Sequence, residues 1–342
     1  MKYHSKLVGA VLAAMLLVTF VFSLSAGQYD LGFLQVAAWC CHKLGLPVLQ
    51  DVNISAQQEA VLMFIRSPRT LVGFMVGAGL AASGTILQGI FSNPLADPGI
   101  IGVSSGATVG AVVAISLGVN AVNMFAMPAF AFVGAICAVF LTIGLATRNG
   151  RIPVLTLLLS GVVVGMLLGA ITAALLVVMD EYKLQQYLFW TIGSLDYRRW
   201  EHVLMGIGPI AAGISIMLLM ARHLNILALG EAEAKAVGMP VVKYRLILLL
   251  VSAMTTAASV CISGSIGFVG LIIPHMMRML VGPNHKHLLP ASIVAGGVFL
   301  LFCDSLGRVL IEKTEVNVGI MTAFLGTPYF LYLLRKNSSI EK

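Results

Sequence analysis

Residues 152–179 read IPVLTLLLSGVVVGMLLGAITAALLVVM and contain no charged side chain. A helix that crosses the hydrocarbon core of a bilayer needs about 20 consecutive apolar residues. The run exceeds that length, and it does not alternate between apolar and polar residues as a membrane strand would. This stretch predicts a membrane-spanning helix and sets how the rest of the chain is interpreted.

The composition of the whole chain agrees with this interpretation. The 342 residues are 59% hydrophobic and 10% charged, with a mean hydropathy of +0.97. Soluble domains carry about 25% charged residues, so this chain lacks the charge to cover a water-exposed surface. We therefore expect an all-α integral membrane protein of about ten transmembrane helices, in a single domain of residues 1–342. The expected spans are 7–26, 70–91, 99–119, 121–146, 152–179, 203–221, 244–262, 264–281, 288–311 and 317–334.

The first span also fits a cleaved signal peptide, because Lys2 and Lys6 precede an apolar run that ends near Gly27. An uncleaved helix is favoured, since the run is long enough to span and other spans follow. With the amino terminus inside, an even number of spans also returns the carboxy terminus inside. More of the 21 Lys and Arg residues then fall on cytoplasmic segments, as the positive-inside rule requires. The net charge of +7 is thus a topology signal, with no basic and aromatic patch for nucleic acid.

A match at a fixed offset of 180 residues suggests an internal repeat. Ser83-Gly84 and Pro94 correspond to Ser263-Gly264 and Pro274. An odd number of spans between the two copies would orient them oppositely, as in the inverted repeats of transporters. Coincidence is the alternative in a chain with 35 glycines.

Two short segments border the second span. Arg66 and Arg69 come before it, where Arg either extends towards the membrane surface or receives carboxylates of an external partner. The run 92–99 after it contains two prolines, which end the helix and leave backbone groups unpaired. That run is either a tight turn or a gate at the inner mouth of a pathway.

The loop 222–243 is the largest cytoplasmic loop in this topology. Its stretch Glu231 to Ala236 favours a helix, and Gly230 and Gly238 bound it. A short exposed helix with small residues suits insertion into a groove on a partner, and a solvated connector is the alternative.

Two polar positions lie near the later spans. His275 is interpreted as a hydrogen-bonded structural residue and not as a ligand. Asp304 and Arg308 have the spacing of a stabilising pair on one helix, and Asp304 would need a charged partner at membrane depth.

These motifs together resemble the iron-chelate, haem and vitamin B12 permease family of bacterial ABC importers. The similarity runs through about residues 60–335 in the order of the family. It rests on 66–69, 84–88, 93–98, 102–107, 229–231, 267–275, Asp304 with Arg308, and 319–328. The resemblance implies the type II importer permease fold, with ten helices that include an inverted repeat. It also implies a bacterial cytoplasmic membrane protein with both termini cytoplasmic.

The resemblance assigns roles to three groups of residues. The arginines that dock the binding protein correspond to Arg66, Arg69 and Arg308. The helix that couples to the ATPase corresponds to Leu229, Gly230, Glu231, Ala234 and Gly238. The inner gate corresponds to Asn93, Pro94, Leu95, Val154 and Leu155. The fifth and tenth helices would line the pathway. Asn317 stands where the family usually has a proline, which affects the expected shape of the outer mouth.

The implied function is inward translocation of a metal chelate, with ferric siderophore as the first expectation and haem or cobalamin as alternatives. The implied partners are two copies of an ABC ATPase, an extracytoplasmic binding protein, a second permease subunit that is expected to be identical, and membrane lipid. No lysine follows a glycine, so the chain lacks the phosphate-binding G-K-[ST] and ATP with Mg²⁺ would bind the ATPase. We expect no catalytic residue, metal site or cofactor in this chain. An ion-coupled secondary transporter, an intramembrane enzyme and a channel are the alternative classes.

Overall fold

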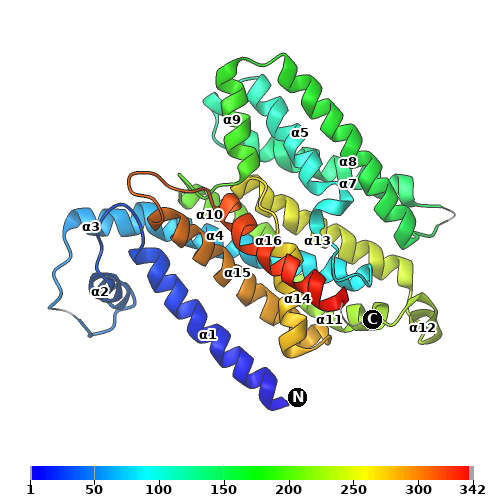
Figure 1. The fold of residues 1–342 in the computed structure, drawn as a ribbon, viewed down its shortest axis with the longest axis horizontal. Helices are drawn as coiled ribbons and strands as arrows, with labels where there is room; N and C mark the ends of the chain where they lie inside the picture. The colour runs from blue at the N-terminus through cyan, green and yellow to red at the C-terminus, as the bar shows by residue number, and fades with distance from the viewer. Residues whose placement is uncertain (1, 50, 149, 339–342) are drawn as a thin grey trace.

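The structure is a computed structural model that describes residues 2–49, 51–148 and 150–338 of the chain. Residues 1, 50, 149 and 339–342, which belong to the predicted single domain, lie outside the described residues. The chain is almost entirely helical (Figure 1). The first half contains α1 (Lys2–Ser25), α2 (Phe33–Lys43), α3 (Ala56–Val61), a π-helical turn (Leu62–Arg66), α4 (Ser67–Ile90), a 3-10 turn η2 (Pro98–Ile101), α5 (Val103–Ser116), α6 (Val119–Val122), α7 (Ala126–Ala146) and α8 (Val154–Val177). The second half contains α9 (Glu181–Ile192), α10 (Trp200–Leu219), α11 (Ala221–Leu227), α12 (Glu231–Ala236), α13 (Val241–Ser263), α14 (Val269–Val281), α15 (His285–Val309) and α16 (Val318–Ser338).

The predicted spans are confirmed as helices. Seven helices of the described residues are long and apolar enough to cross a membrane, and three shorter apolar helices join them. These are α1, α4, α5, α7, α8, α10, α13, α14, α15 and α16, one for each predicted range. The helix that contains α4 differs at its start. It runs continuously from Ala56, so Arg66 lies inside it and does not open it.

Helix α4 is the centre of the molecule. It packs against α10, α13, α14 and α15. Of the 18 residues that form its most apolar stretch, 83% are buried. Glycines allow this close packing, because membrane helices approach where side chains are smallest. A Cβ at Gly84 would lie 1.9 Å from the carbonyl oxygen of Gly270 in α14, and one at Gly77 would lie 2.3 Å from that of Gly296 in α15.

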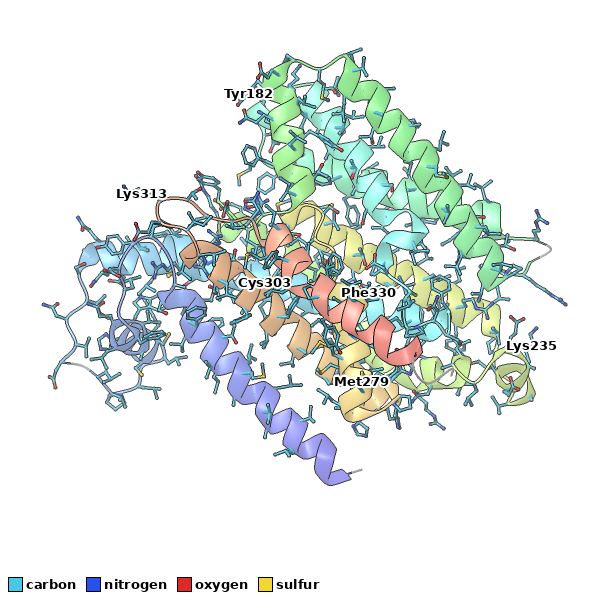
Figure 2. All side chains as sticks on the ribbon, viewed as in Figure 1. Tyr182, Lys235, Met279, Cys303, Lys313 and Phe330 are labelled. Carbon is cyan, nitrogen blue, oxygen red and sulfur yellow. The ribbon has the colours of Figure 1, made fainter. Side chains whose placement is uncertain are left out.

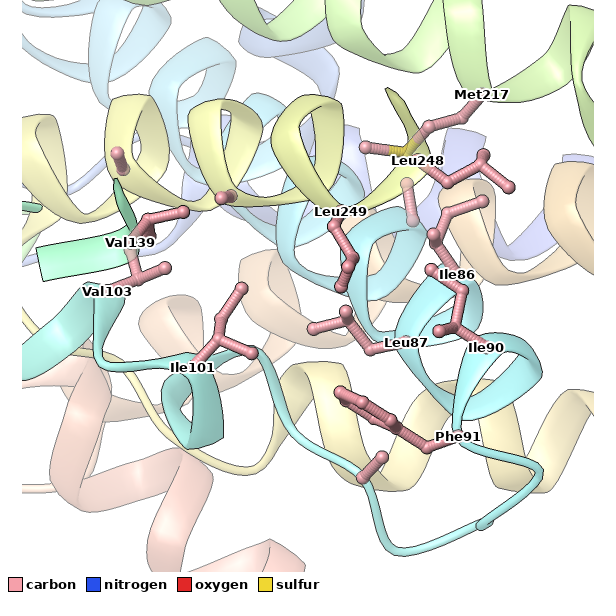
Figure 3. Packing of buried hydrophobic residues seen from close by; sticks show 14 of the residues in the cluster. Ile86, Leu87, Ile90, Phe91, Ile101, Val103, Val139, Met217, Leu248 and Leu249 are labelled. Atoms are coloured by element: carbon pink, nitrogen blue, oxygen red, sulfur yellow. The ribbon is translucent and has the colours of Figure 1, made fainter. Parts of the chain in front are cut away.

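Larger apolar side chains fill the space beside these contacts. Figure 3 shows Ile86, Leu87 and Ile90 of α4 facing Leu248 and Leu249 of α13. The same buried cluster continues through η2 and α5 to α7. A group formed by α5, α7, α8 and α9 stands on the other side of α13 from α1 (Figure 1). Helix α8 is buried over only 17% of its most apolar window, which leaves most of its apolar surface free in this chain.

The order of helix lengths repeats along the chain. With the four-residue α6 left aside, a long, a short and a long helix occur as α4, α5 and α7, and again as α13, α14 and α15. This order supports the predicted repeat, but the match at an offset of 180 residues does not relate equivalent positions. Ser83 lies inside α4, whereas Ser263 is the last residue of α13. Gly84 is a packing residue of the α4–α14 contact.

Candidate functional site

The two ends of the bundle carry different groups of charged residues. We call the end where α1 begins the α1-start face and the end where α1 finishes the α1-end face. Figure 2 shows Lys235, on α12, and Lys313, on the loop after α15, far apart at these two ends. Asn225 donates to Oδ1 of Asn284 and accepts from the backbone N–H of His285, which places α11 beside the start of α15 on the α1-start face. The loop after α15 bonds to Gln28, just after α1, on the α1-end face.

At the α1-end face, Arg69 of α4 is surrounded by three carboxylates. Its Nη2 lies 2.8 Å from Oδ1 of Asp304 and 2.8 Å from Oδ1 of Asp196. Its Nη1 donates to Oε2 of Glu315 at 2.7 Å, and its Nε lies 3.1 Å from Oδ2 of Asp304. Arg308 completes the group, because its Nε lies 3.1 Å from Oδ2 of Asp304, although that N–H does not have the alignment of a hydrogen bond. We call these residues, Arg69, Asp196, Asp304, Arg308 and Glu315, the arginine–carboxylate cluster.

The cluster also fixes α1. Arg308 donates to the carbonyl of Ala26 at 3.0 Å and to Oγ of Ser23 at 2.9 Å. A buried ion is tolerated only when counter-charges and hydrogen bonds replace its hydration, and Asp304 has two guanidinium groups for this purpose. The predicted Asp304–Arg308 pair is therefore confirmed, as is the need for a charged partner of Asp304. The sequence groups Glu315 with Asp304 and Arg308 between the last two spans, but it did not point to Arg69 or Asp196 as parts of this cluster.

Arg66 serves a different purpose nearby. It donates to the carbonyl oxygens of Leu24 and Ser25 at 2.8 and 2.7 Å, and also to that of Tyr29. The last carbonyls of a helix have no partner within the helix, so Arg66 satisfies the end of α1.

The three arginines predicted to dock a binding protein have little free surface. Arg66 is 3%, Arg69 8% and Arg308 2% exposed, and all three bind groups of this same chain. Their docking role stays a prediction, and in this arrangement an external carboxylate would have to replace an internal partner.

At the α1-start face, residues 229–238 form what we call the α12 segment. The predicted short helix is present as Glu231–Ala236, between Gly230 and Gly238, which both have positive φ. Gly230 has φ +119°, a backbone conformation that residues with a side chain rarely adopt, so glycine is favoured there. Ala234 is fully buried and packs with the core cluster, whereas Leu229 is 69% exposed. Leu229 is thus free to contact a partner, and Ala234 anchors the segment.

Charges hold the α12 segment to the bundle. Glu231 accepts from Nζ of Lys235 at 2.6 Å and from both Nη atoms of Arg245 at 3.2 Å. Arg245 in turn donates to the carbonyl of Ile152 at 2.8 Å, just before α8. The hydrogen bond from Lys235 and the charge of Arg245 lower the pKa of the exposed Glu231 carboxyl. This group, Glu231, Lys235 and Arg245, links α12 to α13 and to the start of α8.

The predicted inner gate lies on the same face. Asn93 Oδ1 accepts from the backbone N–H of Leu95 at 2.9 Å, which makes the run after α4 a tight turn. Leu95 and Leu155 are both exposed. The 3-10 turn η2, which follows this run, contacts α8 at Gly161, and Gly161 lies about two helical turns beyond Val154. The inner gate stays a prediction: it would close by contact of Asn93, Pro94 and Leu95 with Val154 and Leu155.

Beside this turn lies a cavity of about 350 Å³ whose lining includes several polar residues. Its lining includes Gln88, Asn93, His275, Arg278 and His285. Nδ1 of His285 donates to Oδ1 of Asn225 at 2.7 Å, and no described residue bonds to Nε2 of His285 or to Oε1 of Gln88. The sequence interpretation made His275 a hydrogen-bonded structural residue, but its Nδ1 has no hydrogen-bond partner among the described residues, and its side chain lines the cavity. Its neighbours come from α4 and α15, and no local spacing in the sequence could have predicted them.

The described part of the chain holds no group of three or more His, Cys, Asp or Glu suited to a metal ion. Its charged groups instead join helices to one another. The described residues thus form ten apolar helices around a small-residue core, with an exposed short helix at one end, which is the architecture of a multi-span integral membrane protein. The chain belongs to the FecCD transport family, which matches residues 15–336.

Individual relatives agree with this assignment. The cobalamin import system permease protein BtuC of Halobacterium salinarum is 47% identical over 81% of this chain and 74% of its own length. The hemin transport system permease protein HmuU of Yersinia pestis is 38% identical over 85% of this chain and 88% of its own. The molybdate import system permease protein MolB of Haemophilus influenzae is 38% identical over 95% of this chain and 94% of its own.

A solved structure extends the agreement to three dimensions. A metal-chelate type ABC transporter in an inward-facing conformation is 36% identical to this chain, with a TM-score of 0.85. The match covers 97% of this chain and 99% of that chain. The predicted family and the type II importer permease fold are thus confirmed, and the chain is an integral membrane protein and a transport component of the kind its relatives represent.

Proposed function

We propose that this chain is the permease subunit of a binding-protein-dependent ABC importer that carries a metal chelate inward across the cytoplasmic membrane. The match to the FecCD transport family over residues 15–336 is the observation that carries this proposal. Relatives named for cobalamin, hemin and molybdate indicate that the substrate varies within the family. Ferric siderophore, haem and cobalamin remain the candidates, and molybdate joins them.

We propose that the importer contains two permease subunits and two ATPase copies, and that each ATPase copy binds the α12 segment of one permease subunit. The exposed Leu229 on a helix that is tied to α13 and α8 through Glu231 and Arg245 supports this assignment. Movement of the ATPase would reach α8 through these contacts. The free apolar surface of α8 supports a second permease subunit, identical to this one, as its partner. Both termini are then cytoplasmic, and the α1-end face receives the binding protein.

The test is ATP hydrolysis by the whole complex in liposomes, with the binding protein loaded in turn with ferric siderophore, haem, cobalamin or molybdate. Stimulation by one loaded form is expected and identifies the substrate. Uptake driven by an ion gradient without ATP would instead support a secondary transporter.

A matched pair of variants tests the α12 assignment. Leu229→Asp should abolish co-purification of the ATPase subunit, because it places a charge in the contact. Leu44→Asp changes an equally exposed leucine (74%) at the end of α2, on the opposite face, and should leave co-purification intact. Equal retention of the ATPase by both variants would refute the assignment.

A further inference from the structure

A groove runs along the outside of the bundle between α1 and α15. Its volume is about 310 Å³. Val8, Leu12 and Leu16 line it from α1, and Ala291, Val294 and Lys286 line it from α15. Figure 1 shows α1 lying along α15 at the edge of the molecule, and only 22% of the most apolar window of α1 is buried. The groove therefore opens to the membrane and not to the interior of the protein.

The length of the groove matches one leaflet of a bilayer. Residues 8 to 16 of α1 rise by about 12 Å at 1.5 Å per residue. Half of the hydrocarbon core of a bilayer is about 15 Å thick. The groove thus begins at the membrane surface on the α1-start face and ends near the midplane.

The walls of the groove suit an acyl chain. Apart from Lys286 and His287, the side chains that line it are apolar. Small residues hollow it out, and a Cβ at Gly9 would meet no atom within 4 Å. In a bilayer such a hollow is filled by lipid, because an empty groove forfeits the dispersion contacts of its walls.

The end of the groove at the membrane surface carries positive charge. Lys286 is exposed, and its ammonium has no ion-pair partner among the described residues. The backbone N–H of Lys286 already donates to the side chain of Asn284, so the ammonium is the group of Lys286 that can bind a ligand. No carboxylate lines the groove. A basic site between membrane helices at a membrane surface attracts anionic lipid headgroups.

We propose that this groove binds one anionic phospholipid, with an acyl chain between α1 and α15 and its phosphate at Lys286. The lipid would extend the contact of α1 with the bundle on the α1-start face, opposite the face where Arg66 and Arg308 hold the end of α1. The proposal does not depend on which substrate the permease carries.

Native mass spectrometry of the purified full-length protein tests the proposal. Detergent-solubilised protein is titrated with phosphatidylglycerol or with phosphatidylcholine, and the number of retained lipids is counted. One phosphatidylglycerol should be retained at concentrations where phosphatidylcholine is not. Lys286→Gln should weaken that retention about fivefold, the contribution of one cation near a lipid headgroup.

Two further variants separate this site from general lipid adhesion. Lys243→Gln removes another exposed lysine that has no ion pair among the described residues and lies outside the groove, so it should retain the lipid as the unchanged protein does. Ala13→Phe fills the groove from an exposed position and should abolish retention without unfolding the protein. Equal retention of both lipids, or no difference between Lys286→Gln and Lys243→Gln, would overturn the proposal.

Discussion

The arginine–carboxylate cluster and the Glu231 group are built from the same kinds of side chain, but they differ in burial. Asp304 and Arg308 are almost completely buried, whereas Glu231 and Lys235 are exposed. In the buried cluster each charge depends on the others, because water cannot replace a lost partner. Between the exposed Glu231 and Lys235 water can, so their contact contributes little. The same pairing is therefore structural at one end of the molecule and adjustable at the other.

The largest effect is expected for Asp304→Ala. The change leaves Arg69 and Arg308 close together without their shared buried counter-charge, which should reduce the free energy of unfolding by about 3–5 kcal/mol. Chemical unfolding in detergent measures it, and Lys43→Ala, at an exposed ion pair with Glu59, is the control. A loss below about 1 kcal/mol would show that the cluster is no more interdependent than a surface pair.

The next effect is expected for Gly230→Ala. The new side chain would be strained at φ +119°, at a cost of about 1–3 kcal/mol, whereas the Glu233 carboxylate beside it can move away. Because α12 is short and peripheral, we expect this loss as local opening, measured as faster hydrogen exchange in 231–236. Gly208→Ala, where a Cβ meets no atom within 4 Å, should leave exchange in 231–236 unchanged. Unaltered exchange in Gly230→Ala would contradict the required left-handed geometry.

A smaller effect is expected for Glu315→Gln. Glu315 is half-buried and accepts one short hydrogen bond from Arg69, which keeps Asp304 and Asp196 as partners. The free energy of unfolding should fall by about 1 kcal/mol. A double-mutant cycle with Asp196→Asn checks interdependence, since the two carboxylates share Arg69. If the two changes in the free energy of unfolding simply add, Glu315 and Asp196 do not interact through Arg69.

The smallest effect concerns Glu231 and pH. Its pKa is lowered in the folded chain, so its ion pairs stabilise α12 above the ordinary Glu pKa of about 4.3 and are lost as pH falls through the lowered value. Between pH 5 and 8 exchange in 231–236, corrected for its intrinsic pH dependence, should not change. Lys235→Gln should alter stability by at most about 0.5 kcal/mol at neutral pH. A large change between pH 5 and 8 would mean that another group controls α12.

The sequence predicted local features well and distant contacts poorly. Apolar run length predicted the spans, and the glycines around Glu231 to Ala236 predicted α12, because both signals lie within one segment. The Asp304–Arg308 pair was predicted for the same reason. The partners of Arg69 come from three separate segments, and no periodicity relates Asp196 to Glu315. The continuous helix from Ala56 was missed because Gln57, Gln58 and Glu59 begin it and Arg66 interrupts its apolar run.

The backbone contacts of Gly77 and Gly84 also determine which parts of the molecule can move. Two helices in contact at their backbones cannot slide past each other without losing many short-range contacts at once, so α4, α14 and α15 form one rigid body. The group of α5, α7 and α8 touches this body mainly through α13, by interdigitated side chains that can repack. We therefore expect the hinge of any inward-to-outward transition to lie along α13. Helix α8 would rotate about this hinge, and α4 would keep its position within the rigid body.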